Sequence, residues 1–274
     1  DQTVLNLKLG AGSYFTQVTE GTTPPLPVMV GAVENVFDTT SFLMSKAATN
    51  RYAGHSEDQA TYSAAFSQFL ATGVRADYDG KVVLTGSQVV NGANMSALYT
   101  GPMQDTALGT VYVLTPQLSG QTITDANFYG PNTSIFTPSI GIGNVIAVGS
   151  YTYAQSSVLN HGMIYRGPIK GGGTWTQIDV PSSAVGGAIV EDTIPHSTMG
   201  DLVVGNYDLR GVPASGNAFI YNMATNTWTI FDQAFGGTHQ LTTAYGIWQN
   251  GIGSTSYTIA GGSNHGIGVN QAFL

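Results

Sequence analysis

The chain contains no cysteine. This absence excludes disulfide bonds, thiolate catalysis and metal sites with cysteine ligands. Charged residues are also scarce, since Asp, Glu, Lys and Arg make up 9% of the 274 residues, where about a quarter is usual. A first residue Asp1 in place of Met fits a chain from which an export signal has been removed. We therefore expect a secreted or periplasmic protein that is not stapled by disulfides.

Positive charge is the scarcest kind. The chain has 8 Lys and Arg against 16 Asp and Glu, and its net charge is −8. Without a basic stripe to neutralise phosphates, nucleic acid is not an expected partner, and neither is an anionic membrane surface. No run of 18 apolar residues occurs, so membrane insertion is not expected either. A small neutral molecule or a glycan fits this composition better.

Glycine and aromatic residues are abundant, with 36 Gly, 14 Tyr and 11 Phe. Tyr and Phe favour β-strands. Five short apolar segments each end on a glycine, and the gaps between these glycines are 55, 63, 56 and 56 residues. The five glycines are Gly31, Gly86, Gly149, Gly205 and Gly261. A nearly constant period of this length predicts a repeat architecture, in which each unit buries its face against its neighbours.

The unit around Gly205 predicts four short antiparallel strands. Residues 188–192 and 201–207 form the first two, around a turn with Pro195 and Gly200, and 217–221 and 227–232 form the others. This is the content of one propeller blade. The last unit stops after its third strand, and residues 3–9 can supply the fourth. We therefore expect one all-β domain over 1–274, a five-bladed β-propeller closed by pairing of its terminal strands, with an open solenoid or a two-sheet sandwich as the alternative.

Two sequence patterns support this expectation. GNAFIYNMATNTWTIFD (216–232) together with SYTIAGGSNHG (256–266) resembles the kelch repeat. AYGIWQNGIG (244–253), YTIAGGS (257–263) and NQAFL (270–274) are similar to the HAF-type repeats of bacterial exported proteins. Both resemblances imply a β-propeller scaffold, and neither motif carries catalytic residues.

One segment, about 45–73, departs from the repeat. Ser56 and Gln59 have the spacing of a capping box. Tyr62, Phe66 and Phe69 then fall on one helical face, and Gly73 ends the pattern. We predict a helical insertion here, and insertions on a rigid scaffold often carry function.

The predicted strand order brings scarce polar side chains to one face of the molecule. Four of the five histidines map to this face, and His196 falls in a turn on the other. The candidate catalytic acids and bases are Glu34, Asp38, His55, Asp208, His239 and His265. The candidate ligand-binding residues are Arg51, Tyr151, Tyr153, His161, Tyr207, Arg210 and Asn264. Tyrosine rings at this face can stack on a sugar.

Known catalytic and cofactor motifs are weak. No cofactor is expected, although His55, Glu57 and Asp58 leave a divalent metal open, since imidazole and carboxylate are suitable ligands. The acids also suit the first turn of a helix. GHSED (54–58) and GGSNHG (261–266) each lack the second glycine of the nucleophile motif G-x-S-x-G.

The expected function is binding of a carbohydrate or other small neutral ligand at the loop face near the axis. The first alternative is a hydrolase or lyase that uses acids and bases of that face. The second is a protein-interaction scaffold. The sequence does not indicate an oligomeric state.

Overall fold

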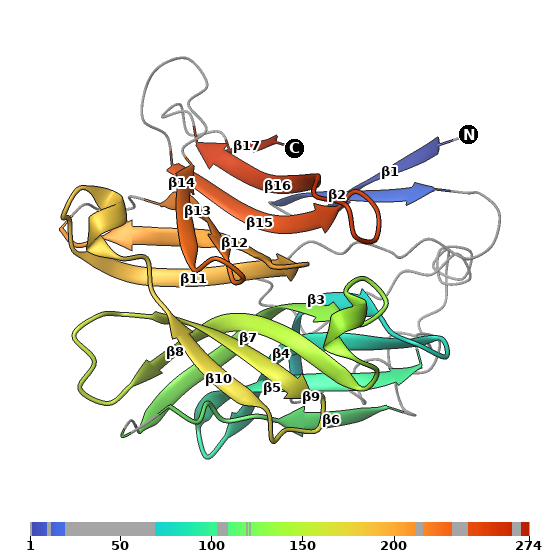
Figure 1. Cartoon of the computed structure of the whole chain (residues 1–274), viewed down its shortest axis with the longest axis horizontal. Helices are drawn as coiled ribbons and strands as arrows, with labels where there is room; N and C mark the ends of the chain where they lie inside the picture. The colour runs from blue at the N-terminus through green and yellow to red at the C-terminus, as the bar shows by residue number, and fades with distance from the viewer. Residues whose placement is uncertain are drawn as a thin grey trace.

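A computed structural model describes residues 2–9, 12–19, 69–102, 109–118, 120, 122–211, 216–231, 241–264 and 270–273. Most of this part of the chain is β-strand (Figure 1). Its two helices are short 3-10 turns, η2 (Pro138–Ile140) and η3 (Ser182–Val185). None of the helices in the described ranges is long and apolar enough to cross a membrane.

The strands form five antiparallel sheets in chain order. The hairpin at the N-terminus pairs β1 (Gln2–Leu9) with β2 (Gly12–Thr19). The first four-stranded sheet contains β3 (Phe69–Ala76), β4 (Lys81–Val90), β5 (Ala93–Pro102) and β6 (Thr110–Val113). The second contains β7 (Ile123–Thr133), β8 (Asn144–Tyr153), β9 (His161–Pro168) and β10 (Thr174–Ile178). The third contains β11 (Val190–Met199), β12 (Leu202–Leu209), β13 (Asn217–Asn222) and β14 (Thr227–Phe231). The last contains β15 (Leu241–Gln249), β16 (Tyr257–Asn264) and β17 (Asn270–Phe273).

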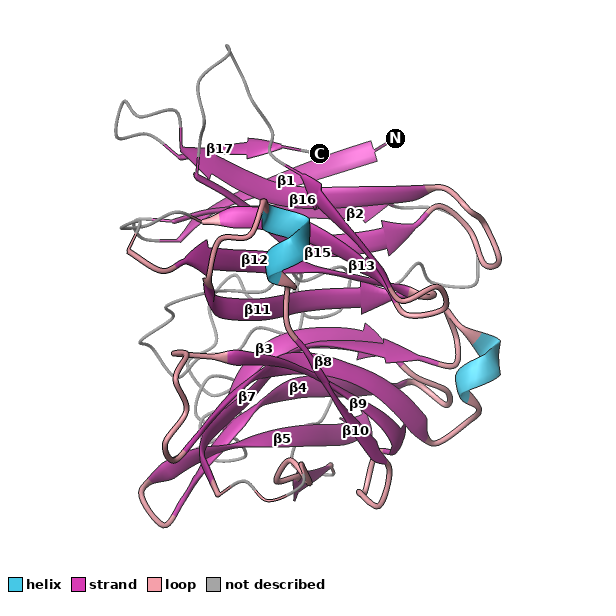
Figure 2. Ribbon diagram, turned by 60° about the vertical axis from the view of Figure 1, so that its left-hand side comes forward, coloured by secondary structure: helices cyan, strands magenta, loops and turns pink. Residues whose placement is uncertain are grey.

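From β3 onward, each sheet packs on the next one along the chain (Figure 2). In the last three sheets the first strand contacts the sheet before it: β7 lies against β3, β4 and β5, β11 against β7, β8 and β9, and β15 against β11, β12 and β13. Apolar side chains fill these interfaces. Phe128 and Tyr165 are fully buried between the sheet β3–β6 and the sheet β7–β10. Phe219 is fully buried between the sheet β7–β10 and the sheet β11–β14. Burial of such aromatic side chains is the main source of stability in a stack of sheets.

The prediction of a closed five-bladed propeller is wrong. β1 pairs with β2 and β17 pairs with β16, and none of the hydrogen-bonded strand pairs of the described residues joins the two ends of the chain. Residues 3–9 pair instead with β2, a strand that lies only about ten residues further along the chain. What holds is the all-β class, with antiparallel sheets that follow one another along the chain.

The predicted helical insertion is also contradicted where the structure describes it. Residues 69–73 belong to strand β3, in which Phe69 is buried and Leu70 is 46% exposed. Phe69 and Leu70 therefore lie on opposite faces of a strand and not on one face of a helix. The rest of the predicted insertion lies outside the described residues.

Each described repeat glycine occupies the same place in its sheet. Gly86, Gly149, Gly205 and Gly261 lie on the second strand, opposite a β-bulge in the first strand. The bulge turns a backbone carbonyl toward the glycine, so that a Cβ on Gly149 would overlap the carbonyl oxygen of Asn127. The same overlap exists between Gly205 and Ile194. Glycine is therefore required here by a close approach of two backbones. Gly31 lies outside the described residues.

The extra residues of these bulges form a row across the sheets. They are Thr72, Tyr129, His196 and Tyr245. The ring of His196 lies 5.5 Å from that of Tyr129 and 5.1 Å from that of Tyr245. His196 is fully buried and its Nε2 lies 2.6 Å from Asn206 Oδ1. It therefore belongs to strand β11 and not to a turn, because this strand continues through Pro195, which the bulge accommodates.

Asparagines at the start of third strands tie one sheet to the next. Asn94 Nδ2 lies 3.0 Å from Asp125 Oδ2, and Asn160 Nδ2 lies 2.6 Å from Asp192 Oδ1. In both pairs the aspartate lies at the beginning of the next sheet. Burial raises the pKa of Asp192, and the hydrogen bond from Asn160 opposes that rise. The bond from Asn160 to Asp192 fixes the loop before β9 against β11, and the candidate site lies next to this loop.

Candidate functional site

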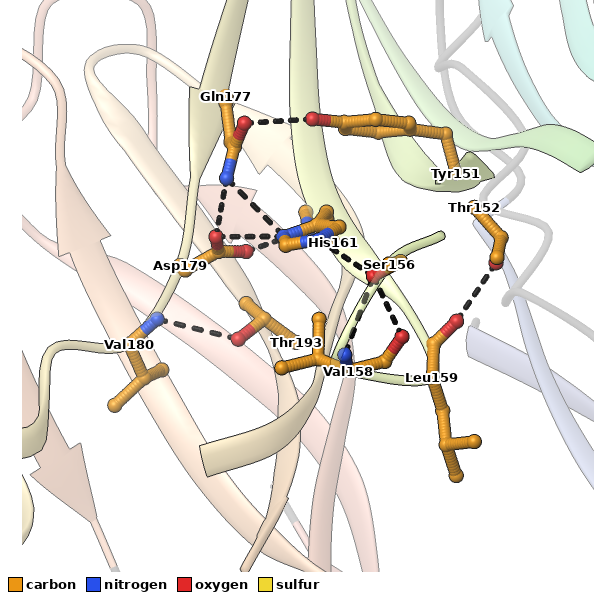
Figure 3. A network of polar contacts seen from close by, with 11 residues as sticks. Tyr151, Thr152, Ser156, Val158, Leu159, His161, Gln177, Asp179, Val180 and Thr193 are labelled. Carbon is orange, nitrogen blue, oxygen red and sulfur yellow. Dashed lines mark hydrogen bonds and ion pairs between the residues drawn. The ribbon is translucent and has the colours of Figure 1, made fainter. Parts of the chain in front are cut away.

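The candidate site lies at the open end of the second sheet, where β8 turns into β9 (Figure 3). His161 is the first residue of β9 and pairs with Tyr151 of β8. Side chains two residues apart share one face of a strand, so Tyr153 lies on the same face as Tyr151. The ring of His161 therefore contacts both tyrosines, at 5.4 Å from Tyr151 and 5.2 Å from Tyr153.

Asp179 orients the imidazole of His161. It directly follows β10, whose last residue Ile178 pairs with Gly162. This register places Asp179 Oδ2 2.8 Å from His161 Nδ1 and Asp179 Oδ1 3.1 Å from the N–H of Gly162. A carboxylate can only accept hydrogen bonds, so the contact favours the imidazole tautomer that carries its proton on Nδ1.

Ser156 faces the other nitrogen of the same ring. Its Oγ lies 3.1 Å from His161 Nε2 and accepts the N–H of Val158 at 3.2 Å. Gln155, with φ at 70°, turns the chain in the left-handed conformation directly before it. The carbonyl of Val158 lies 2.7 Å from Oγ and competes with His161 for the hydroxyl proton. Ser156 is partly exposed, whereas His161 is only 8% exposed.

Serine, histidine and aspartate are thus hydrogen-bonded in line. With the proton on Nδ1 held by Asp179, Nε2 of His161 has a lone pair directed at the hydroxyl of Ser156. This is the arrangement in which a histidine acts as general base toward a serine nucleophile. The N–H of Val158 favours a negative charge on Oγ, because it already donates to that oxygen.

Arg210 connects the serine loop to the third sheet. Its guanidinium donates to the carbonyl of Ser157, and its Nε lies 3.4 Å from Glu191 Oε1. The ion pair is about one-third exposed, so its contribution to stability is at most about 1 kcal/mol. Its contact with the loop places the serine segment between two sheets.

Two depressions on the described residues lie away from the side chains of the candidate site: one is lined by Asn144 and Arg166, the other by Lys170 and Trp175. In this part of the chain, groups of three or more His, Asp or Glu that could hold a metal ion do not occur.

The structure brings some of the predicted site residues together. Tyr151, Tyr153 and His161 are in mutual contact, and Arg210 contacts the adjoining loop. Tyr207 is 4% exposed in the core, and Asp208 pairs with Asp192 in the register of β12 and β11. Asn264 ends β16. Several further candidates lie outside the described residues: Glu34, Asp38, Arg51, His55, His239 and His265.

Sequence reasoning missed Ser156, Gln177 and Asp179. The segment QSSVLNH carries no glycine pattern around its serines, so the nucleophile motif gave no signal. One signal was present: residues 162–165 and 174–180 have strand patterns, with His161 directly before the first and Asp179 near the end of the second. Antiparallel pairing of these two strands places both residues at one end of the sheet.

Comparison of the chain with models of known protein families, with curated proteins and with solved structures gives no match. The likeness to kelch and HAF-type repeats therefore stays a prediction.

Buried tyrosines set an alkaline limit on stability. Burial raises the pKa of four tyrosines above the ordinary value of about 10: Tyr151, Tyr165, Tyr221 and Tyr257. Below about pH 10 these phenols are neutral in both states and stability does not depend on them. Above it the unfolded chain ionises first, so the free energy of unfolding falls as pH rises.

We expect the Tyr151→Phe variant to lose less of its free energy of unfolding between about pH 9 and pH 11 than the wild type, because one such group is gone. Urea unfolding across this range measures the effect. Tyr78→Phe, at a residue that is 41% exposed, is the matched control. Equal slopes in the wild type and the Tyr151→Phe variant would contradict the prediction.

Proposed function

We propose that the protein is an acyl hydrolase, in which Ser156 is the nucleophile, His161 the general base and Asp179 the group that orients His161. One observation carries the proposal: Ser156 Oγ lies 3.1 Å from His161 Nε2 while His161 Nδ1 lies 2.8 Å from Asp179 Oδ2. The substrate class is a carboxylic ester. Ser156 is partly exposed, so an ester that projects from a larger molecule can reach it.

The reaction proceeds in two steps through one histidine. Ser156 Oγ bonds to the ester carbonyl carbon while its proton moves to His161 Nε2. The bond to the leaving alcohol then breaks, and this alcohol takes the proton from Nε2, which leaves the acyl group on Ser156. Water repeats the sequence, releases the carboxylic acid and restores the serine. Asp179 accepts the Nδ1–H throughout.

Binding of a neutral carbohydrate is the second candidate function, and the ring of Tyr153 favours it. This side chain is partly exposed beside the exposed Gln177, and its ring is stacked on His161 with an interplanar angle of 17°. Aromatic rings next to polar groups bind the apolar face of a sugar. Under this function a sugar binds equally well to the wild type and to a Ser156→Ala variant.

An alkyl fluorophosphonate tests the proposed hydrolase. Such a reagent bonds through phosphorus to an activated serine and loses fluoride, while the serine proton moves to the base. We expect one adduct per chain, found on the peptide that contains Ser156, and none in a His161→Gln variant that retains the wild-type circular dichroism. Absence of labelling at Ser156, or equal labelling of both proteins, would overturn the proposal.

A further inference from the structure

A second layer of hydrogen bonds surrounds the contact between His161 and Asp179. Gln177 Nε2 lies 2.6 Å from Asp179 Oδ2 and 3.1 Å from His161 Nδ1. Three polar groups thus meet at one point, and the proton on Nδ1 decides which bonds form. If Nδ1 carries the proton, Asp179 Oδ2 accepts from both His161 and Gln177. If Nδ1 is bare, its lone pair faces the carboxylate at 2.8 Å, which is repulsive.

A hydrogen bond to the amide oxygen of Gln177 fixes the orientation of its side-chain amide. Tyr151 donates its hydroxyl to Gln177 Oε1 at 2.7 Å (Figure 3). Burial, and then the charges of Asp179 and Tyr153, raise the pKa of the Tyr151 phenol, so this hydroxyl keeps its proton as a donor. With Oε1 held by Tyr151, the NH₂ group of Gln177 faces Asp179. The opposite orientation would bring an amide oxygen against the carboxylate.

We propose that Tyr151 and Gln177 are positioning residues that hold His161 as the Nδ1–H tautomer, so that Nε2 stays directed at Ser156. This inference rests on the proposed hydrolase for its catalytic consequence, but the tautomer itself is a property of the free protein. Gln177 keeps Asp179 turned toward His161 Nδ1, and Tyr151 keeps Gln177 in the one orientation that allows this.

The ¹⁵N chemical shifts of the His161 ring test the proposal directly, because a protonated and a bare ring nitrogen differ strongly in shift. In the wild type at neutral pH we expect a protonated Nδ1 and a bare Nε2. In the Tyr151→Phe and Gln177→Met variants both nitrogens should move toward intermediate shifts, as the two tautomers exchange. The double variant should resemble either single one, because both residues act through one chain of bonds.

Tyr153→Phe is the matched control for the tautomer. It removes the same phenol oxygen from the neighbouring ring on His161, and the Tyr153 hydroxyl makes no hydrogen bond to the described residues. Its His161 shifts should equal those of the wild type. Wild-type shifts in both Tyr151→Phe and Gln177→Met, or effects that simply add in the double variant, would overturn the proposal.

Ester hydrolysis separates this proposal from the proposed function. In the Tyr151→Phe and Gln177→Met variants we expect kcat for ester hydrolysis to fall about tenfold with KM unchanged, because the substrate still binds and only the general base His161 is misplaced. If the tautomer shifts but the wild type hydrolyses no ester, the positioning role stands and the hydrolase fails. If the wild type hydrolyses esters and the tautomer is constant in every variant, the hydrolase stands and the positioning role fails.

Discussion

Ser156→Ala should lower kcat for ester hydrolysis by at least about a thousandfold, the scale on which loss of a serine nucleophile acts. The reason is chemical. Without Oγ the acyl group has no atom to bond to, and His161 Nε2 has only water to activate. KM should change little, since the hydroxyl contributes little to ground-state binding. Steady-state kinetics on a series of p-nitrophenyl esters measure both parameters.

Ser157→Ala is the matched control for this prediction. Ser157 is exposed and contacts Arg210 through its backbone carbonyl, which the substitution keeps. Its kcat should stay within about twofold of the wild type. A Ser156→Ala variant that is folded and as active as the Ser157→Ala variant would show that Ser156 is not the nucleophile.

Gly149→Ala should lower the free energy of unfolding by roughly 3 kcal/mol. The added Cβ would overlap the carbonyl oxygen of Asn127 and lie 2.8 Å from the Cα of Phe128. Both are backbone atoms of the bulged strand β7, so β7 and β8 must separate to accept the methyl group. Phe128, which is fully buried and stacked on Trp175, would lose packing as they do. Urea unfolding measures the difference.

Gly246→Ala is the control that distinguishes the steric overlap at Gly149 from the general effect of replacing a glycine in a strand. Gly246 also lies beside a bulge, on β15, but the nearest atom to an added Cβ is the Cβ of Ala260 at 3.8 Å. This is ordinary van der Waals contact, so stability should change by less than about 1 kcal/mol. Equal loss in both variants would mean that the bulge carbonyl does not explain the repeat glycine.

The sequence predicted the strands better than their assembly. Short apolar runs around Gly149 and Gly205, bounded by turn residues, indicate buried strands because such a run is a local property of the sequence. The closure of a ring is not local. It depends on whether residues 3–9 pair with the C-terminal strand or with residues 12–19, and both partners have strand-forming residues. The helix over 45–73 fails at Phe69 for a related reason, since short apolar runs fit either period.

The candidate site, too, could be predicted from the sequence only in part. Tyr151, Tyr153 and His161 could be predicted because the repeat places them in or beside the connection between its second and third strands, and because histidine is scarce. Ser156 and Asp179 could not, because one lies in an irregular loop and the other after a strand end, where no periodicity fixes the direction of a side chain. Their contact with His161 needs the register of β8, β9 and β10, which pairs Tyr151 with His161 and Ile178 with Gly162.

The intact mass of the protein during ester turnover tests the central role of Ser156 most directly. Wild-type protein, quenched with acid while it hydrolyses a slowly deacylated ester, should gain the mass of one acyl group, and digestion should place this group on the peptide that contains Ser156. The Ser156→Ala variant should gain no acyl group. Wild-type protein that turns over ester without any acyl mass, or that carries the same acyl mass as Ser156→Ala, would contradict the account.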